Sequence, residues 1–379
     1  MASEKDISYV RDIMLAFADR TGTTNPDNPA RRYLWTDAHA VCTYLSLHVA
    51  TGNNDYLELA LALVDQVHSI LGRHRDDDAR VGWISGLSEE EGREHPTAGG
   101  LRIGKSLNER QRTDPVDERL EWERDGQYFH YLTKWMHALC RVAAVTGEAV
   151  YRRWAVELAE AAYAGFAVTA AGSKRLCWKM SIDLSYPLVA SAGHHDPLDG
   201  YVTFAEIAGT GESQLDEEVA ELANMIADRD WATTDPLGIG GLLFDASRVI
   251  RLTAAGSMDG SKLAATLIDA AGVSLAAYAR EPSLGLPAEY RLAFRELGLC
   301  IGLHAATRAL PIVEKHRPVF VAGLAHELEN VGQYAPLAGT IEAFWRQPAS
   351  QGANTWQEHE DINAVTLATS LLPDEFLRA

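Results

Sequence analysis

The chain alternates apolar helical stretches with short polar breaks. Apolar residues that recur three and four positions apart predict about twelve helices. Several of these stretches end in a Thr-Gly pair, as at Thr51-Gly52, Thr146-Gly147 and Thr210-Gly211, and a looser copy ends at Gly256. A few polar residues follow each stop before another amphipathic helix begins. The pattern predicts a series of helical hairpins.

The predicted helices cover most of the chain, and strand patterns are few. The clearest strand pattern lies at 174–184, where apolar residues alternate with more polar neighbours. A short strand or β-hairpin is therefore expected there. The expected helical ranges are 6–18, 35–50, 54–72, 126–145, 149–166, 198–208, 214–228, 237–254, 261–279, 288–308, 318–331 and 357–371.

Alternate helices begin with different kinds of residue. The even-numbered ones begin with acidic, aromatic and histidine residues, whereas the helices between them begin with ordinary surface residues. This asymmetry favours an all-α (α/α)6 barrel whose inner helices point their first turns into a polar pocket. An open solenoid of helix pairs is the alternative, but its repeats would be nearly equal in length. The Thr-Gly stops are unequally spaced, which favours the barrel.

A single barrel domain is expected over residues 1–379, because no break in composition divides the chain. The longest connection, residues 73–124, lies between the third and fourth helices. Connections of this length are uncommon and are often functional lids. Because this one contains Trp83, Leu101 and Ile103 beside its charges, we expect an ordered lid over the pocket.

Charge and hydropathy exclude two classes of partner. The formal net charge is −19, which repels nucleic acid and anionic membranes. No apolar run reaches the ~18 residues needed to cross a bilayer. The charged N-terminus lacks the layout of a secretory signal, so a cytoplasmic location is expected. The sequence leaves the oligomeric state open.

No metal or cofactor is expected. Carboxylates surround His359, but the spacing matches no common zinc signature. The stretch from Gly99 to Ser106 has the spacing of a phosphate loop, yet neither a buried strand before it nor a helix starting at Lys105 is predicted. Three of the four cysteines lie in apolar helical stretches, which is typical of buried free thiols.

The first candidate site residues lie at the starts of the second and fourth helices. Each start combines carboxylates with aromatic residues. Sugar sites need this mixture, because sugar rings stack on aromatic faces while hydroxyl groups require charged acceptors. The alternative is that the carboxylates are helix caps or helix-end charges. The candidates are Arg32, Trp35, Asp37, Glu123, Asp125 and Tyr128.

Further candidates lie at later helix starts and in the predicted strand. His195 and Asp199 are four residues apart, so they would face the same side of the sixth helix as an acid/base pair. The alternative for Asp199 is a charge that only complements the helix dipole. Two arginines and two glutamates at the tenth helix would form either a buried ionic network or a ligand clamp. The remaining candidates are Trp178, Glu289, Tyr290, Arg291, Arg295, His359 and Asp361.

This arrangement resembles the six-hairpin, or (α/α)6-barrel, superfamily of carbohydrate-active proteins. The stretch from Trp35 to Leu57 resembles the first hairpin of unsaturated glucuronyl hydrolases. The stretch from Asp125 to Phe129 resembles their next inner helix, which begins with His-Asp, one further residue and Gly-Phe. The aspartate of that motif is catalytic in the family, and the resemblance implies this role for Asp125. Here Arg124 stands in place of the histidine, and the glycine is displaced.

A second branch of the superfamily, the N-acylglucosamine 2-epimerase and mannose isomerase group, transfers protons with histidines beside a sugar carbonyl. Gly193-His194 resembles the start of its motif, which is Gly-His, two further residues and Glu-Trp. Pro197 stands where the glutamate is expected. By position, the resemblance implies that His359 supplies the other base.

The leading interpretation is a carbohydrate-active enzyme of glycoside hydrolase type that acts on a small sugar or glycoside. Asp125 would protonate the leaving oxygen, and Asp37 or Asp199 would activate water or attack the sugar. A sugar isomerase or 2-epimerase is the alternative, with His195 and His359 sharing the proton transfer. A lyase, a terpenoid-type cyclase and a non-catalytic helical binding scaffold are further alternatives.

Overall fold

The described part of the chain is mainly helical, and it divides into two compact units. One unit consists of residues 1–17 and 228–379, and the other of residues 18–227. The single domain over residues 1–379 stays a prediction. The computed structural model describes residues 3–25, 27–170, 172–209 and 215–378.

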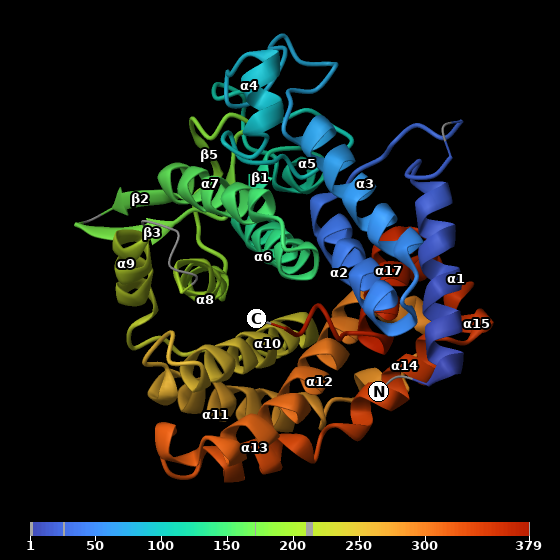
Figure 1. The fold of residues 1–379 in the computed structure, drawn as a ribbon, viewed down its shortest axis with the longest axis vertical. Helices are drawn as coiled ribbons and strands as arrows, with labels where there is room; N and C mark the ends of the chain where they lie inside the picture. The colour runs from blue at the N-terminus through green and yellow to red at the C-terminus, as the bar shows by residue number, and fades with distance from the viewer. Residues whose placement is uncertain (1–2, 26, 171, 210–214, 379) are drawn as a thin grey trace. The chain divides into compact units, whose positions relative to one another are not determined.

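The unit of residues 18–227 is built from helical hairpins. Its longer helices are α2 (Leu34–Thr51), α3 (Asn54–Leu71), α6 (Phe129–Thr146), α7 (Ala149–Phe166), α8 (Asp196–Ala208) and α9 (Asp216–Ile226). The helix α2 pairs with α3, and α6 pairs with α7 (Figure 1). In addition, α2 packs on α6, and α6 packs on α8. Three helices predicted to be inner ones are therefore neighbours.

Glycines end two of these helices as the sequence predicts. Gly52 follows α2 with a φ of 70°, and Gly147 follows α6 with a φ of 76°. Glycine favours this left-handed conformation because it lacks a Cβ atom. The preceding Thr51 hydroxyl donates a hydrogen bond back to the carbonyl of Leu47 over 2.7 Å. The pair Thr210-Gly211 lies outside the described residues.

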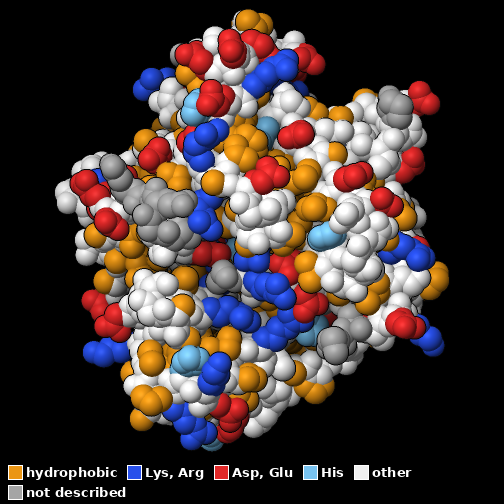
Figure 2. Space-filling model, viewed as in Figure 1, with side chains coloured by type: hydrophobic (Ala, Val, Ile, Leu, Met, Phe, Trp, Pro, Cys, Tyr) orange, Lys and Arg blue, Asp and Glu red, His pale blue; other side chains and the backbone are white. Residues whose placement is uncertain are grey.

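The connection over residues 73–124 carries two short helices, α4 (Glu89–Glu94) and α5 (Glu118–Glu123). Its apolar residues Trp83, Leu101 and Ile103 are buried. Several contacts fasten it to α7, among them a hydrogen bond from Trp154 Nε1 to the carbonyl of Glu94 over 2.8 Å and a contact of 2.7 Å between His95 Nδ1 and Glu157 Oε1. Acidic and basic side chains cover the segment around α4 (Figure 2). Its role as a lid stays a prediction.

The strand or hairpin expected near residues 174–184 is present as parts of two small sheets. In the first, β2 (Ala167–Ala170) pairs with β3 (Ser173–Leu176). In the second, β4 (Lys179–Met180) lies between β1 (Gln127–Tyr128) and β5 (Pro187–Val189). All of these pairings are antiparallel. The second sheet brings Trp178 to the start of α6.

The unit of residues 1–17 and 228–379 is centred on α12 (Ala293–Lys315). This helix is long and apolar enough to cross a bilayer, but 67% of its apolar window is buried, which is typical of a core helix. It packs on α10, α13, α14 and α17, and α11 packs on α10 and α13. The bounds are α10 (Pro236–Ala254), α11 (Ser261–Tyr278), α13 (Leu324–Gly332), α14 (Pro336–Trp345) and α17 (Glu360–Leu371).

Shorter elements complete this unit. They include the helices α15 (Pro348–Gln351) and α16 (Asn354–Gln357) and the 3-10 turns η1 (Pro282–Gly285), η2 (Ala288–Tyr290) and η3 (Arg317–Val319). The turn η2 explains why α12 begins later than the predicted start at residue 288. The remaining long helix, α1 (Glu4–Arg20), spans the division between the two units.

Candidate functional site

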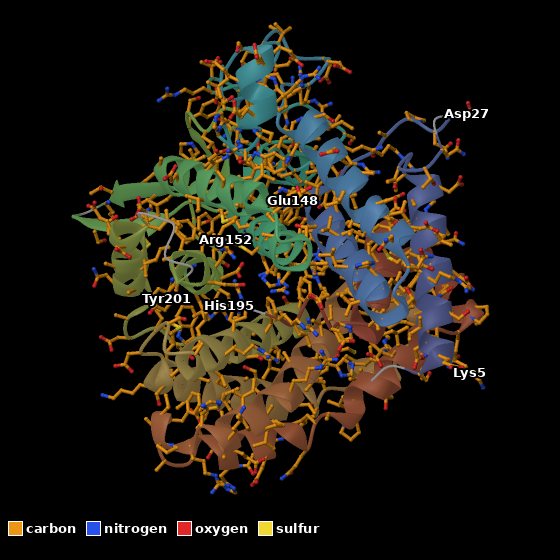
Figure 3. The ribbon with its side chains drawn as sticks, in the orientation of Figure 1. Lys5, Asp27, Glu148, Arg152, His195 and Tyr201 are labelled. Carbon is orange, nitrogen blue, oxygen red and sulfur yellow. The ribbon has the colours of Figure 1, made fainter. Side chains whose placement is uncertain are left out.

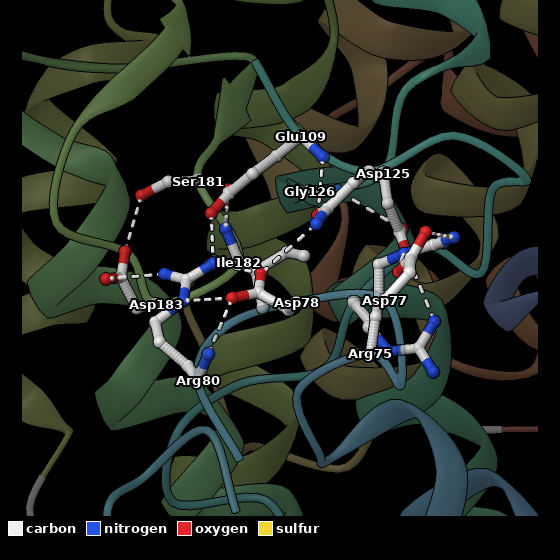
Figure 4. Close-up of polar contacts among 12 residues, drawn as sticks. Arg75, Asp77, Asp78, Arg80, Glu109, Asp125, Gly126, Ser181, Ile182 and Asp183 are labelled. Carbon is white, nitrogen blue, oxygen red and sulfur yellow. Dashed lines mark hydrogen bonds and ion pairs between the residues drawn. The ribbon is translucent and has the colours of Figure 1, made fainter. Parts of the chain in front are cut away.

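Asp125 is buried inside a shell of donors. Its Oδ2 accepts hydrogen bonds from Arg102 over 2.9 Å and from Arg75 over 3.3 Å. Its Oδ1 accepts from the backbone N–H of Gly104 over 2.9 Å and from that of Gly126 over 3.1 Å. Figure 4 shows this carboxylate beside Arg75. Two guanidinium groups and two amides thus occupy both oxygens of this buried carboxylate.

The stretch with the spacing of a phosphate loop supplies part of that shell. The N–H of Gly104 points at the Asp125 carboxylate, and the N–H of Leu101 donates to Gln127 Oε1 over 2.9 Å. Added Cβ atoms would collide at Gly100 and Gly104, each of which also has a positive φ. This loop therefore wraps two side chains of its own unit, which agrees with the expectation that it binds no nucleotide.

Three of the predicted sugar-binding aromatic residues lie close together. The Tyr128 and Trp178 rings are 5.3 Å apart, and His130 stacks on Trp178 with centroids 6.3 Å apart and planes 15° apart. On its other side, His130 lies 6.0 Å from Trp35. Tyr131 contacts Trp35, Tyr128 and His130. We call this set the aromatic strip, and its members are Trp35, Tyr128, His130, Tyr131 and Trp178.

Charged residues of α6 face acidic residues of α8 beside this strip. Lys134 Nζ donates to Asp199 Oδ1 over 2.7 Å, and Thr133 Oγ1 donates to Asp199 Oδ2 over 2.5 Å. Further along the same two helices, His137 Nδ1 of α6 lies 3.6 Å from Glu206 Oε2 of α8. A lysine cation and a hydroxyl donor stabilise Asp199 as an anion.

One turn nearer the start of α8, Asp196 faces His130. Its Oδ1 lies 3.6 Å from His130 Nδ1, beyond hydrogen-bond length. Asp196 Oδ2 and His130 Nδ1 are both buried and have no hydrogen-bond partner among the described residues. Gly193 makes room for the carboxylate, because an added Cβ atom there would lie 2.5 Å from the Asp196 oxygens. Buried polar atoms without partners are rare, and they mark a place where a ligand can supply the missing hydrogen bonds.

Two predicted site residues, Arg32 and Asp37, hold the first turn of α2 in place. Asp37 Oδ2 accepts a hydrogen bond from the backbone N–H of Tyr33 over 2.9 Å, and its Oδ1 lies 3.5 Å from Arg32. Arg32 also donates to the carbonyl of Thr21 over 2.5 Å. Nearby, burial lowers the pKa of His39 to about 4, so this imidazole is neutral at pH 7. These contacts fix the first turn that carries Trp35.

The other predicted residues of this unit lie around the same helix starts. Glu123, near the end of α5, is exposed. His195 is the N-cap residue of α8 and is partly exposed, and Figure 3 shows it with Tyr201 on that helix. The structure thus brings Tyr128 and Trp178 into direct ring contact, and His130 and Tyr131 link Trp35 to them. Asp125 lies in a separate polar shell.

The remaining predicted residues belong to the other unit. Arg291 forms a buried ion pair with Glu296 over 2.6 Å, and Trp345 Nε1 donates to the same carboxylate over 2.7 Å. Of the two arginines and two glutamates that were expected to form a buried ionic network or a ligand clamp, only Arg291 and Glu296 form a buried ion pair among the described residues. Arg295 pairs with Asp235 over 2.8 Å. Glu289, Tyr290 and His359 are exposed, and Asp361 is partly buried.

Sequence reasoning did not include Asp196 and His130, the two residues with unused buried atoms, among the candidate site residues. A usable signal existed, since His130, Lys134 and His137 share one face of a helix and Asp196, Asp199 and Glu206 share one face of another. In the residues that the structure describes, no three His, Cys, Asp or Glu side chains are grouped as a metal site would require.

Two solved structures are similar to nearly the whole chain. The GH76A α-1,6-mannanase from Salegentibacter sp. HEL1_6 matches 98% of this chain and 100% of its own, with a TM-score of 0.53 and 13% identity. The GH76 α-mannanase of Bacteroides thetaiotaomicron matches 98% of this chain and 97% of its own, with a TM-score of 0.56 and 8% identity. The chain has the six-hairpin, (α/α)6 fold.

The predicted fold class is thereby confirmed. Both of these neighbours are α-mannanases, and what this chain shares with them is the fold. No protein-family model matches the sequence, and no curated protein matches it. At these identities the likeness concerns the fold, and the chemistry has to be argued from the residues themselves.

Proposed function

We propose that the protein is a glycosidase-like hydrolase of a small carbohydrate, and that its reacting groups lie at the first turn of α8. The observation that carries this proposal is the Asp196 and His130 pair beside the aromatic strip, in which the buried atoms His130 Nδ1 and Asp196 Oδ2 have no hydrogen-bond partner among the described residues. A sugar on the strip would place hydroxyl groups and a glycosidic oxygen beside donors and acceptors that are otherwise unused.

Two carboxylates in different surroundings suit glycoside hydrolysis. Asp199 accepts hydrogen bonds from Lys134 and Thr133, which stabilise its anion. Within the part of the chain that the structure describes, Asp196 has no lysine or arginine partner and keeps one oxygen unused. We therefore assign proton donation to the leaving oxygen to Asp196, and the anionic role, either activation of water or attack on the sugar, to Asp199. This assignment replaces Asp125, whose oxygens are occupied by arginines and amides.

Kinetics of carboxylate variants test this assignment. Removal of a general acid lowers kcat by about 10²–10⁴-fold, so Asp196→Asn should lose that much hydrolysis of oligosaccharides while the fold is kept. Asp216→Asn is the matched control, because Asp216 is an exposed aspartate in the first turn of the neighbouring α9. Reducing-end release is measured on α-1,6-linked manno-oligosaccharides and on α- and β-linked gluco-oligosaccharides. Equal rates for wild type and Asp196→Asn would contradict the assignment.

A sugar isomerase or 2-epimerase is the second candidate. The observation in its favour is the same pair, because an imidazole 3.6 Å from a carboxylate is also an arrangement for proton transfer at the carbon beside a sugar carbonyl. Here His130 would take the role that the sequence assigned to His195 and His359. Incubation of monosaccharides in heavy water distinguishes the two functions, since only the isomerase incorporates deuterium at C2.

A further inference from the structure

Trp122 extends the aromatic strip out to the surface. Its side chain is 53% exposed, which is unusual for tryptophan, and it lies on the short helix α5. Its ring meets that of Trp178 edge to face, with centroids 4.9 Å apart and planes 72° apart. Trp178 in turn contacts Tyr128 and His130. Trp122 is therefore continuous with the proposed site but lies further from the Asp196 carboxylate.

Buried contacts hold Trp122 in this position. Lys179 is buried, and its Nζ donates to the carbonyls of Glu121 over 2.5 Å and Arg124 over 2.8 Å, on either side of Trp122 in sequence. Arg110 Nε donates to Glu121 Oε1 over 2.8 Å. At the other end of α5, Asp117 accepts hydrogen bonds from two backbone N–H groups. The exposed ring is thus presented by an anchored turn, which reduces the entropy lost when a ligand binds.

The residues beside Trp122 are suited to a sugar. Glu123 and Arg124 follow Trp122 directly in sequence, are at least partly exposed, and carry an acceptor and donors. Sugars present an apolar ring face edged by hydroxyl groups, so an exposed indole with polar neighbours matches both parts. A ring bound at Trp122 and a ring bound against Trp178 and His130 would be adjacent units of one chain.

From this continuity we propose that the site binds an oligosaccharide of at least two sugar units, with Trp122 as the platform for a unit beyond the one at Asp196. The inference rests on the proposed function, because it takes the aromatic strip as the substrate site. It names the substrate class as an oligosaccharide rather than a free monosaccharide. It also assigns Trp122 as the residue that determines the preference for chain length.

Binding as a function of chain length tests this inference. Isothermal titration is performed with manno- and gluco-oligosaccharides of one to five units in an Asp196→Asn background, so that the ligands stay intact. The dissociation constant is expected to fall as units are added, and Trp122→Ala is expected to weaken binding of the longer ligands about tenfold while sparing the monosaccharide. Leu120→Ala is the matched control, since Leu120 is 41% exposed on the same short helix.

The outcomes separate this inference from the proposed function. Loss of the chain-length dependence in Trp122→Ala, but not in Leu120→Ala, supports the platform. Equal loss in both variants, or tight binding of long ligands by Trp122→Ala, overturns it. If length-dependent binding persists but the wild-type protein cleaves none of the ligands, the platform stands and the hydrolase assignment fails. If no ligand binds, both fail.

Discussion

Asp125 shows how one buried carboxylate can organise a long connection. It joins Arg75, Arg102 and Gly104 of the connection to the start of α6. Asp125→Asn removes the charge, so Arg102 loses its carboxylate partner and Arg75 keeps only its pair with Asp77. Breaking a buried pair costs about 3–5 kcal/mol, so the free energy of unfolding should fall by about that amount. Urea denaturation followed by tryptophan fluorescence measures it.

Asp77 supplies the control for this prediction. It pairs with the same Arg75, over 2.6 Å, but its side chain is 55% exposed. Exposed pairs contribute about 0.2–1 kcal/mol, so Asp77→Asn should have a small effect on stability. An Asp125→Asn variant with wild-type stability and no hydrolytic activity would show instead that Asp125 is the catalytic acid that the sequence suggested.

At the residue scale, the sequence predicts which kinds of residue form the site better than it predicts the role of each residue. Trp35, Tyr128 and Trp178 were predicted to stack on a sugar. They lie in one strip because Trp35 and Tyr128 stand at neighbouring helix starts and the small sheet brings Trp178 to the start of α6. The partners of Asp125 could not be predicted. Arg75 and Arg102 lie in a connection without helical periodicity, and no local pattern indicates which carboxylate a loop arginine will meet.

At the scale of elements, packing between helices makes stability depend on pH. His68 of α3 is buried, its Nε2 accepts a hydrogen bond from Trp135 Nε1 of α6 over 3.1 Å, and its ring meets Trp154 of α7. Burial lowers the pKa of His68 to about 3. The unfolded chain, with a pKa of about 6.5, binds this proton more readily. The contribution of neutral His68 is therefore present above pH 6.5 and is lost as the pH falls toward 3.

His68→Gln isolates this effect, because glutamine can accept the same hydrogen bond but does not titrate. Between pH 7 and pH 5, the wild type should lose about 2 kcal/mol of stability relative to His68→Gln. The measurement is the difference in unfolding free energy between the two proteins at each pH, so that other titrating groups, such as His39, cancel. A constant difference across this range would contradict the burial argument.

Most elements could be predicted because their boundaries carry local signals. Glycines in the left-handed region end α2 and α6, and Asp235 caps α10 by accepting a hydrogen bond from the N–H of Gly238 over 3.2 Å. The helix α14 was not predicted. It follows α13 with only residues 333–335 between them, so the two short helices lack the polar break that marks the other boundaries.

At the scale of the whole molecule, the six-hairpin fold was predictable because it repeats one unit. This unit is a pair of helices whose inner helix begins with acidic, aromatic or histidine residues. The position of the reacting groups was not. Which carboxylate is paired and which has an unused oxygen depends on contacts between α6 and α8, such as Lys134 with Asp199, whose residues are 65 positions apart in the chain. Hydrophobic periodicity predicts which side chains share a face of a helix. It does not predict which side chains of another helix they contact.

The central claim is that Asp196 donates a proton to a glycosidic oxygen beside the aromatic strip. The most direct test is proton NMR in heavy water of oligosaccharides incubated with the wild type and with Asp196→Asn. The account predicts new reducing-end anomeric signals with the wild type, no deuterium at C2, and little product with the variant. Deuterium at C2, or equal cleavage by both proteins, would contradict it.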